Sequence, residues 1–183
     1  MKKTDLSQYD PGDYTPGAGF LQRGLWFITN IVFFKCPFST CSRLKRFLLR
    51  MFGAKAGTGL VIKPSVNIKH PWRLEIGNHV WIGEAVWIDN LDDVVIGNNC
   101  CISQGAMLLC GNHNYTRSSF DLITGKIILE EGTWIGAQSI VAPGITCHSH
   151  SVLTAGSLAN RDLEAFSIYQ GNPAVKVKDR IIQ

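Results

Sequence analysis

From about residue 60 onward, the chain places a large or branched apolar residue at every sixth position. An α-helix repeats its buried face about every 3.6 residues and a half-buried strand about every second residue, so neither explains this period. A parallel β-helix does, because each hexapeptide forms one flat side and one corner, and three hexapeptides complete a coil. The series comprises Ile62, Ile68, Ile76, Ile82, Ile88, Ile96, Ile102, Leu108, Leu129, Ile135, Val141, Cys147 and Leu153. We therefore expect an all-β fold in which these side chains point into a narrow prism.

The period of six is interrupted at three places. Two intervals of eight residues end at Ile76 and Ile96, and an interval of twenty-one residues ends at Leu129. Because these breaks are one coil apart, they should fall on the same corner of the prism. Long loops on a regular scaffold are usually functional, so we expect the active site at this corner. The alternative is that the β-helix simply places its insertions at corners.

The segment before the repeats has a different pattern. Residues 5–19 are rich in glycine and proline and indicate an extended arm, whereas residues 20–34 and 40–52 predict two helices. Large apolar residues alternate with arginine and lysine in the second helix. These helices could cap the open end of the β-helix, which is the favoured interpretation, or residues 25–52 could make a peripheral membrane contact.

We divide the chain into an arm and helical extension at 1–57, a β-helix domain at 58–170 with a loop at 109–128, and a tail at 171–183.

Composition and charge serve mainly to exclude classes of function. A formal net charge of +4 suits an anionic ligand or membrane surface better than a long nucleic-acid footprint, so no nucleic-acid partner is expected. The start of the chain does not resemble a secretory signal, and the six cysteines show no zinc spacing. We expect a cytoplasmic protein with reduced, mostly buried cysteines.

Several segments resemble the hexapeptide-repeat acyltransferases, in the branch of maltose-, galactoside- and colanic-acid-type O-acetyltransferases. They are residues 74–83, 95–106 and 133–136, the Gly-Asn-His-Asn-Tyr segment at 111–115, and the Gly-Asn-Pro-Ala segment at 171–174. The resemblance implies a left-handed parallel β-helix and a homotrimer that binds acetyl-CoA between adjacent subunits. It also implies acetyl transfer to a saccharide hydroxyl, expected as a step of exopolysaccharide or cell-surface polysaccharide biosynthesis, in the cytoplasm or at the inner face of the membrane.

His113 is the residue that matches the loop histidine of this family, which activates the acceptor hydroxyl. Imidazole suits a general base, because an ordinary pKa of about 6.5 leaves it largely neutral in the cytosol. Asn114 stands where the family commonly has aspartate, so a hydrogen-bonding role replaces an ion pair. The residues expected to contact or orient the acceptor are Asp89, Asn90, Asn112, Asn114 and Tyr115. For Asp89 and Asn90, plain turn formation is the alternative.

The resemblance also indicates where acetyl-CoA would bind. Residues expected along its pantetheine arm are Trp134, Gly136, Ala137 and Ala155, and the cations expected near its phosphates are Lys176, Lys178 and Arg180. Trp134 could instead pack a trimer interface, and the three cations could form a solvated tail. No metal is expected.

Other readings of the same residues stay open. Cys110 could pair with His113 as a nucleophile, although a small buried cysteine is the favoured interpretation. A γ-type carbonic anhydrase would need three converging histidines, yet of His70, His79, His113, His148 and His150 only His70 and His113 map to one edge. A serine or amino-sugar acceptor, or a non-catalytic binding β-helix, are further alternatives.

Overall fold

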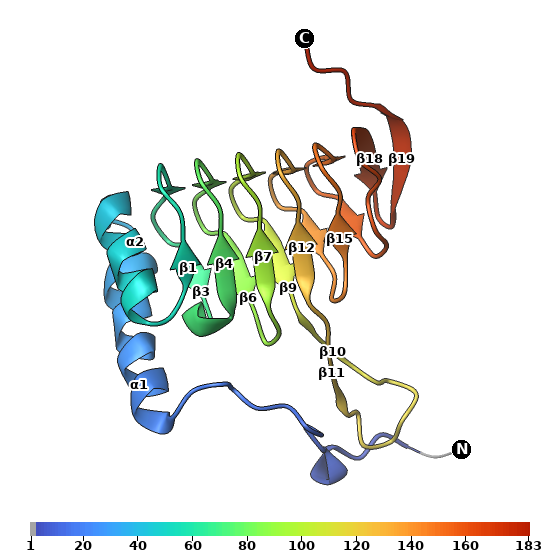
Figure 1. Cartoon of the computed structure of the whole chain (residues 1–183). Coiled ribbons are helices and arrows are strands. Elements are labelled where there is room, and N and C mark those ends of the chain that lie inside the picture. Colours follow the sequence, from blue (N-terminus) through green and yellow to red (C-terminus); the bar gives the residue numbers. More distant parts are fainter. Residues whose placement is uncertain (1–2) are drawn as a thin grey trace.

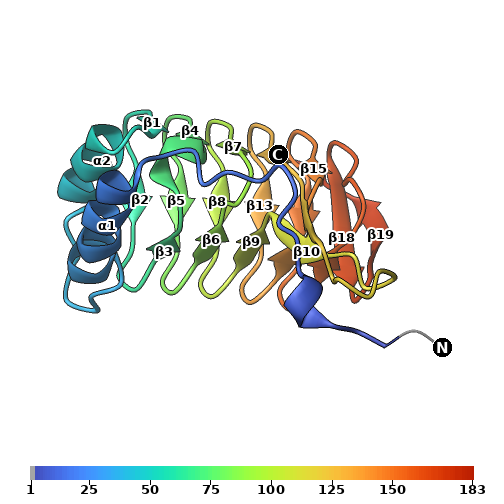
Figure 2. The same ribbon diagram turned by 90° about the horizontal axis from the view of Figure 1, so that it is seen from below.

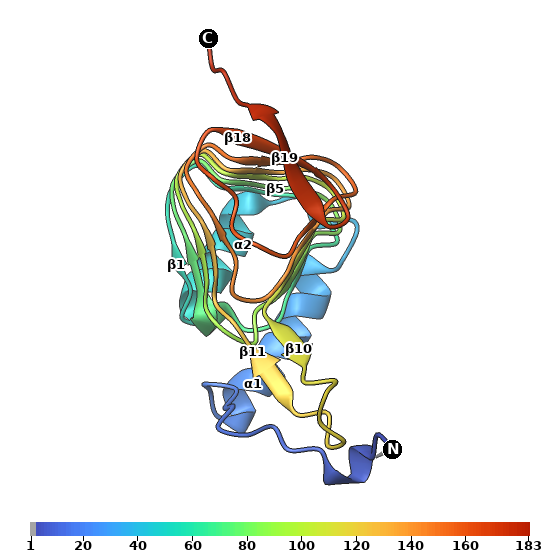
Figure 3. The same ribbon diagram turned by 90° about the vertical axis from the view of Figure 1, so that its right-hand side faces the viewer.

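The computed structural model describes residues 3–183 and confirms a mostly β fold with a short helical extension near the N-terminus (Figure 1). The strands of successive coils stack in parallel into three sheets, which form the sides of a triangular prism (Figure 3). Sheet A contains β1 (Lys55–Ala56), β4 (Leu74–Ile76), β7 (Val94–Ile96), β12 (Ile127–Leu129) and β15 (Thr146–Cys147). Sheet B contains β2 (Val61–Ile62), β5 (Trp81–Ile82), β8 (Cys101–Ile102), β13 (Trp134–Ile135), β16 (Val152–Leu153), β18 (Ser167–Gly171) and β19 (Ala174–Asp179). Sheet C contains β3 (Asn67–Ile68), β6 (Trp87–Asp89), β9 (Met107–Leu109), β14 (Ile140–Val141) and β17 (Leu158–Ala159).

The six-residue series fills the interior of the prism, as expected. Its members are at most 2% exposed and stack in register from coil to coil. Ile62, Ile82 and Ile102, for example, are aligned partners on β2, β5 and β8. Complete burial of such a side chain contributes about 1.5–3 kcal/mol, so each coil is stabilised mainly by its neighbours.

The three interruptions of the series all lie on one corner, between sheets C and A. We call it the C–A corner, and it consists of residues 69–73, 89–93, 110–126 and 142–145. The first interruption contains the short helix η3 (Pro71–Arg73). The longest one is not structureless, because it forms an antiparallel hairpin of β10 (Gly111–His113) and β11 (Leu122–Thr124). The prediction of a single ridge of insertions is confirmed.

The corner between sheets A and B carries no insertion. This A–B corner repeats one short turn at residues 57–60, 77–80, 97–100, 130–133 and 148–151. The third residue of each turn has a positive φ, and these residues are Gly59, His79, Asn99, Gly132 and His150. Glycine adopts this conformation without strain, and asparagine and histidine adopt it more often than most residues do.

Two helical segments cover the N-terminal end of the prism (Figure 1). They are α1 (Phe20–Thr29), continued by the π-helical turn η2 (Asn30–Phe34), and α2 (Ser42–Met51). Trp26 donates its indole N–H to the carbonyl of Ile68 at 2.9 Å, and the buried ammonium of Lys45 donates to the carbonyl of Lys63 at 2.8 Å. The helices therefore satisfy main-chain groups at the open edge of the first coil, which is what a cap must do.

The arm before α1 runs along the C–A corner from the cap toward the hairpin (Figure 2). It includes one short 3-10 helix, η1 (Leu6–Gln8). Trp72 donates its indole N–H to the carbonyl of Pro16 at 2.7 Å, and the main-chain N–H of Asp5 donates to the carbonyl of Ser118 at 2.8 Å. The arm is thus attached both to the prism and to the hairpin.

The C-terminal segment ends the prism differently from the expected tail. Strand β18 continues to Gly171, and β19 pairs antiparallel with it across a turn at Asn172 and Pro173. Sheet B therefore extends past residue 170, and strand structure ends only at Asp179. Within residues 3–183, every helix is too short or too polar to cross a bilayer.

Candidate active site

His113 ends β10 on the hairpin that projects from the C–A corner. Its Nδ1 lies 2.9 Å from the main-chain carbonyl oxygen of Phe120. A carbonyl oxygen only accepts hydrogen bonds, so Nδ1 carries the ring proton and Nε2 of the neutral imidazole is left as the basic nitrogen. The partly buried ring is therefore oriented and held in one tautomer.

Phe120 fixes the imidazole in a second way. Its ring stacks on that of His113, with centroids 4.4 Å apart and an interplanar angle of 10°. Phe120 has a φ of 54°, an uncommon value for a residue with a large side chain. The hairpin register holds it there, since His113 pairs with Leu122. The same residue thus supplies a hydrogen-bond acceptor and a packing surface to the histidine.

The other predicted residues of this loop lie around His113 and have distinct contacts. The Asn112 side-chain oxygen accepts the main-chain N–H of His113 at 2.8 Å. Asn114 accepts from the hydroxyl and the N–H of Thr116, which forms an Asx-type turn, so its side chain shapes the loop. Tyr115 is 81% exposed and has room to contact a ligand.

One coil below, the two residues expected near the acceptor have different environments. Asn90 is fully buried, and its side-chain amide bonds both the N–H and the carbonyl of His70. It holds the corner and offers no surface to a ligand, which favours its turn-forming alternative. The carbonyl of Asn90 accepts in turn from Nδ1 of His70 at 3.2 Å. Burial lowers the pKa of His70, so this histidine is a neutral structural element.

Asp89 lines a groove of about 330 Å³ between α1 and the C–A corner. The carboxylate lies 2.9 Å from the ammonium of Lys69, and the rings of Trp72 and Trp87 form part of the wall. Apolar walls with a few fixed charges are typical of small-molecule sites. The main-chain carbonyl of Asp89 accepts from the N–H of Cys110, so the groove adjoins the base of the hairpin.

The residues expected along acetyl-CoA lie on sheet B and the corner that follows it. Trp134 projects outward from β13 and donates its indole N–H to the hydroxyl of Ser103 at 2.9 Å. Ser103 lines a groove of about 320 Å³ that also contains Trp81. Ala155 is exposed on the same corner, next to the tightly stacked Gly136, where an added Cβ would come within 2.5 Å of the Ala155 nitrogen. The outward face of sheet B thus carries indole rings, and small residues lie on the corner that follows it.

The three basic residues after the prism are not equally available. Lys176 pairs with Glu164 and Asp179 at 3.0 and 2.9 Å. Arg180 donates to the carbonyls of Gly132 and His150, which ties the end of the chain to the A–B corner. Within residues 3–183, Lys178 takes part in no ion pair, so it is the cation best placed to meet a phosphate.

The two halves of the predicted site lie on opposite sides of the prism. His113 extends from the C–A corner, and that corner faces away from sheet B (Figure 3). The outward face of sheet B, with Trp134 and Lys178, therefore cannot reach the imidazole within one chain. A site that uses both needs a second copy.

Comparisons with known proteins identify the family. The chain is 33% identical over 177 residues to WcaF of Escherichia coli (strain K12), provisionally named a colanic acid biosynthesis acetyltransferase, and the match covers 97% of each protein. It is 24% identical over 135 residues to the galactoside O-acetyltransferase of the same strain, covering 72% of this chain and 66% of that one. No protein-family model matches the chain. The chain belongs to the hexapeptide-repeat acetyltransferases.

The fold agrees with that of solved members of the family. A hexapeptide-repeat acetyltransferase from Vibrio cholerae, solved with acetyl coenzyme A, superposes with a TM-score of 0.82 at 18% identity, covering 96% of this chain and 97% of that one. A maltose O-acetyltransferase from Clostridium difficile superposes with a TM-score of 0.75 at 17% identity, covering 88% of each chain. The expected fold, family and enzyme class, an acetyl-CoA-dependent acyltransferase, are confirmed.

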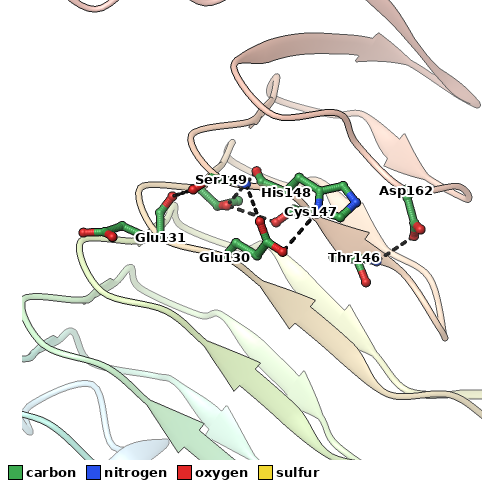
Figure 4. Close-up of polar contacts among 8 residues, drawn as sticks. Glu130, Glu131, Thr146, Cys147, His148, Ser149 and Asp162 are labelled. Carbon is green, nitrogen blue, oxygen red and sulfur yellow. Dashed lines mark hydrogen bonds and ion pairs between the residues drawn. The ribbon is translucent and has the colours of Figure 1, made fainter.

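The structure does not support the two alternative chemistries, a cysteine nucleophile and a carbonic anhydrase. Cys110 is completely buried, and burial raises the pKa of its thiol to about 12, so it is a packing residue and not a nucleophile. The histidines of the carbonic anhydrase alternative are divided between two corners. His148 and His150 belong to the A–B corner, where His148 Nδ1 contacts a Glu130 carboxylate oxygen at 3.1 Å (Figure 4). No three candidate metal ligands gather anywhere in residues 3–183.

Two neighbours of His113 were not among the predicted site residues. Phe120 lies seven positions further along the chain, and only the hairpin register brings its carbonyl to the imidazole. Tyr9 belongs to the arm, and its ring lies 5.9 Å from that of His113. No periodicity or spacing in the sequence indicates either contact, because both depend on how irregular segments fold back.

Proposed function

We propose that this acetyltransferase moves an acetyl group from acetyl-CoA to a hydroxyl of a saccharide, with His113 as the general base. The names of its relatives support a saccharide acceptor, since one is assigned to colanic acid biosynthesis and another to galactosides. A role in cell-surface polysaccharide biosynthesis follows. Precursors of such polymers are carried on lipids, so this acceptor would be met at the cytoplasmic face of the membrane.

The hydrogen bond from His113 Nδ1 to the Phe120 carbonyl is the observation that supports this role. It leaves Nε2 as the only proton acceptor on the ring. Nε2 removes the proton of the acceptor hydroxyl as that oxygen attacks the acetyl thioester, and the imidazolium then returns the proton to the departing sulfur. The Phe120 carbonyl stabilises the transient positive charge, because Nδ1–H points directly at it. No covalent acyl-enzyme is required.

The position of His113 supports a homotrimer with sites between subunits. In a cyclic assembly, one copy presents its C–A corner to sheet B of the next, which brings the base of one chain to the acetyl-CoA surface of its neighbour. Trp134, Gly136, Ala137 and Ala155 would line the pantetheine chain, and Lys178 would meet a phosphate. Asp89, Tyr115 and the groove beside α1 would face the acceptor.

Subunit mixing tests both the base and the assembly. His113→Ala removes the base, and Ala155→Trp places a bulky ring on the exposed acetyl-CoA surface, so each homotrimer should be nearly inactive. Coexpression with two different affinity tags allows mixed trimers to be purified, and about a third of their sites combine an intact base with an intact surface. Acetylation of a saccharide panel should recover to that fraction.

Two results would argue against the proposal. Mixed trimers that stay inactive would place the whole site within one chain. Full activity of the His113→Ala homotrimer would remove the histidine from the mechanism. Acetyl-CoA binding to His113→Ala, measured by calorimetry, serves as the control and should be nearly unchanged.

A further inference from the structure

The outer face of the cap is an exposed apolar surface that neither the fold nor the proposed site explains. Many large apolar side chains on α1, η2 and α2, and in the connection between η2 and α2, are between 39% and 90% exposed. Apart from Phe27 and Ile31, which line the groove beside α1, they are Phe20, Leu21, Leu25, Ile28, Val32, Phe38, Leu44, Phe47 and Met51. Contiguous surfaces of this kind usually mark an interaction site.

The same two helices already use their inner faces for packing. Trp26, Phe34 and Leu49 are at most 2% exposed and belong to the core. The exposed residues are therefore not needed to pack the helices on the prism. They form a second apolar face on helices whose first apolar face is satisfied.

The charge of this end of the molecule is strongly one-sided. Residues 14–74 contain ten lysine and arginine side chains and no aspartate or glutamate, whereas the other 122 residues contain eight basic and fourteen acidic ones. The cations exposed on the cap helices and the loop between them are Arg43 and Arg50 on α2, and Arg23 and Lys35 at the rim of the groove beside α1. None of them takes part in an ion pair with any residue in 3–183. On α2, Arg43 and Arg50 alternate with the exposed Leu44, Phe47 and Met51.

The helices also lie flat. Figure 1 shows α1 and α2 across the end of the prism, roughly perpendicular to the direction in which the coils stack. Their outer faces therefore share one plane. A planar surface could meet both helices at once, with the β-helix standing upright on it.

From these observations we infer that the outer face of the cap docks on an anionic lipid bilayer. Apolar side chains of an amphipathic helix enter the interface between headgroups and acyl chains, and arginine and lysine around them attract the negative headgroups. Charge complementarity selects this partner, because a second copy would bring a surface free of acidic residues against an equally basic one. The inference rests on the cap alone and does not depend on the base or the acceptor.

Vesicle sedimentation with the full-length protein tests the inference. The wild type should bind vesicles of phosphatidylglycerol and phosphatidylcholine at least about tenfold more tightly than vesicles of phosphatidylcholine alone, and the difference should shrink as salt is raised. The double variant Arg43→Glu/Arg50→Glu should lose about tenfold or more of the affinity for anionic vesicles. Phe38→Ser/Phe47→Ser should weaken binding to both vesicle types.

The control is Lys126→Glu/Arg161→Glu, which reverses the same number of exposed charges away from the cap and should bind as the wild type does. Equal loss in the control would show that net charge, and not this face, determines binding. If the wild type does not bind anionic vesicles, the inference is wrong, and this result does not depend on whether the variants fold. So does light scattering that shows the Phe38→Ser/Phe47→Ser trimer falling apart, because the face would then be an interface between copies.

Discussion

Two corners of the same prism carry a histidine stacked on a phenylalanine, and only one of them has the features of an active site. On the A–B corner, His150 stacks on Phe166 with ring centroids 4.7 Å apart and an angle of 4°. On the C–A corner, His113 stacks on Phe120 at 4.4 Å and 10°. Both phenylalanines have positive φ values, 49° and 54°. The pairs are alike in composition and geometry.

The two histidines differ in how they are connected to the prism. His150 belongs to a regular turn and is packed between coils, since a Cβ on Gly132 of the preceding coil would lie 2.8 Å from its ring. Arg180 also donates to its carbonyl. His113 stands outside the coils on a hairpin, where the Phe120 carbonyl fixes one ring nitrogen and the other stays basic. A stacked histidine is therefore a structural feature by itself, and the insertion is what places His113 outside the coils.

Replacing each histidine by alanine should separate the two corners most clearly. His113→Ala should lower kcat by about 10² or more, because the acceptor hydroxyl loses its proton acceptor. His150→Ala should keep kcat within about twofold and reduce thermal stability, because it opens a gap between coils. Steady-state acetylation and thermal unfolding of both variants measure this contrast. Comparable losses of kcat would mean that the corners are not functionally distinct.

The phenylalanines should show a smaller version of the same contrast. Phe120→Ala keeps the main-chain carbonyl but removes the stacked ring, so the imidazole gains freedom and kcat should fall about three- to tenfold. Phe166→Ala removes the equivalent ring from the A–B corner and should leave kcat unchanged. The ring signals of His113 in NMR spectra should broaden only in the first variant. A full loss of activity in Phe120→Ala would instead indicate that the hairpin had collapsed.

The contrast between corners was predictable from the sequence only in part. The six-residue period identified the fold. The longer intervals before Ile76, Ile96 and Leu129 identified the corner with insertions, because a repeat constrains every coil in the same way. The contacts of the insertion itself were not predictable. Phe120 reaches His113 through an irregular hairpin, and the burial of Asn90 depends on its fit against the main chain of His70.

The arm adds a third difference, because it covers the C–A corner and leaves the A–B corner open. Tyr9 approaches His113 to 5.9 Å from a segment held by the Asp5–Ser118 main-chain bond. Tyr9→Ala should raise the KM for the saccharide a few-fold with little change in kcat, because it removes a wall beside the base and leaves the base intact. Tyr9→Phe should behave as the wild type. If kcat falls and KM stays constant, Tyr9 orients the imidazole and does not contact the acceptor.

The smallest effect is expected where the corners should not differ at all. Cys110 lies at the base of the β10–β11 hairpin and Cys100 on the A–B corner, and both are buried. Burial raises the pKa of the Cys100 thiol to about 11 and that of Cys110 to about 12, so neither forms a thiolate at neutral pH. Replacing either by alanine should cost roughly 1 kcal/mol of stability through lost packing and should leave kcat unchanged. Iodoacetamide should not inactivate the wild type through either thiol. A selective loss of kcat in Cys110→Ala would show that the C–A corner activates more than its imidazole, because burial alone treats the two cysteines alike.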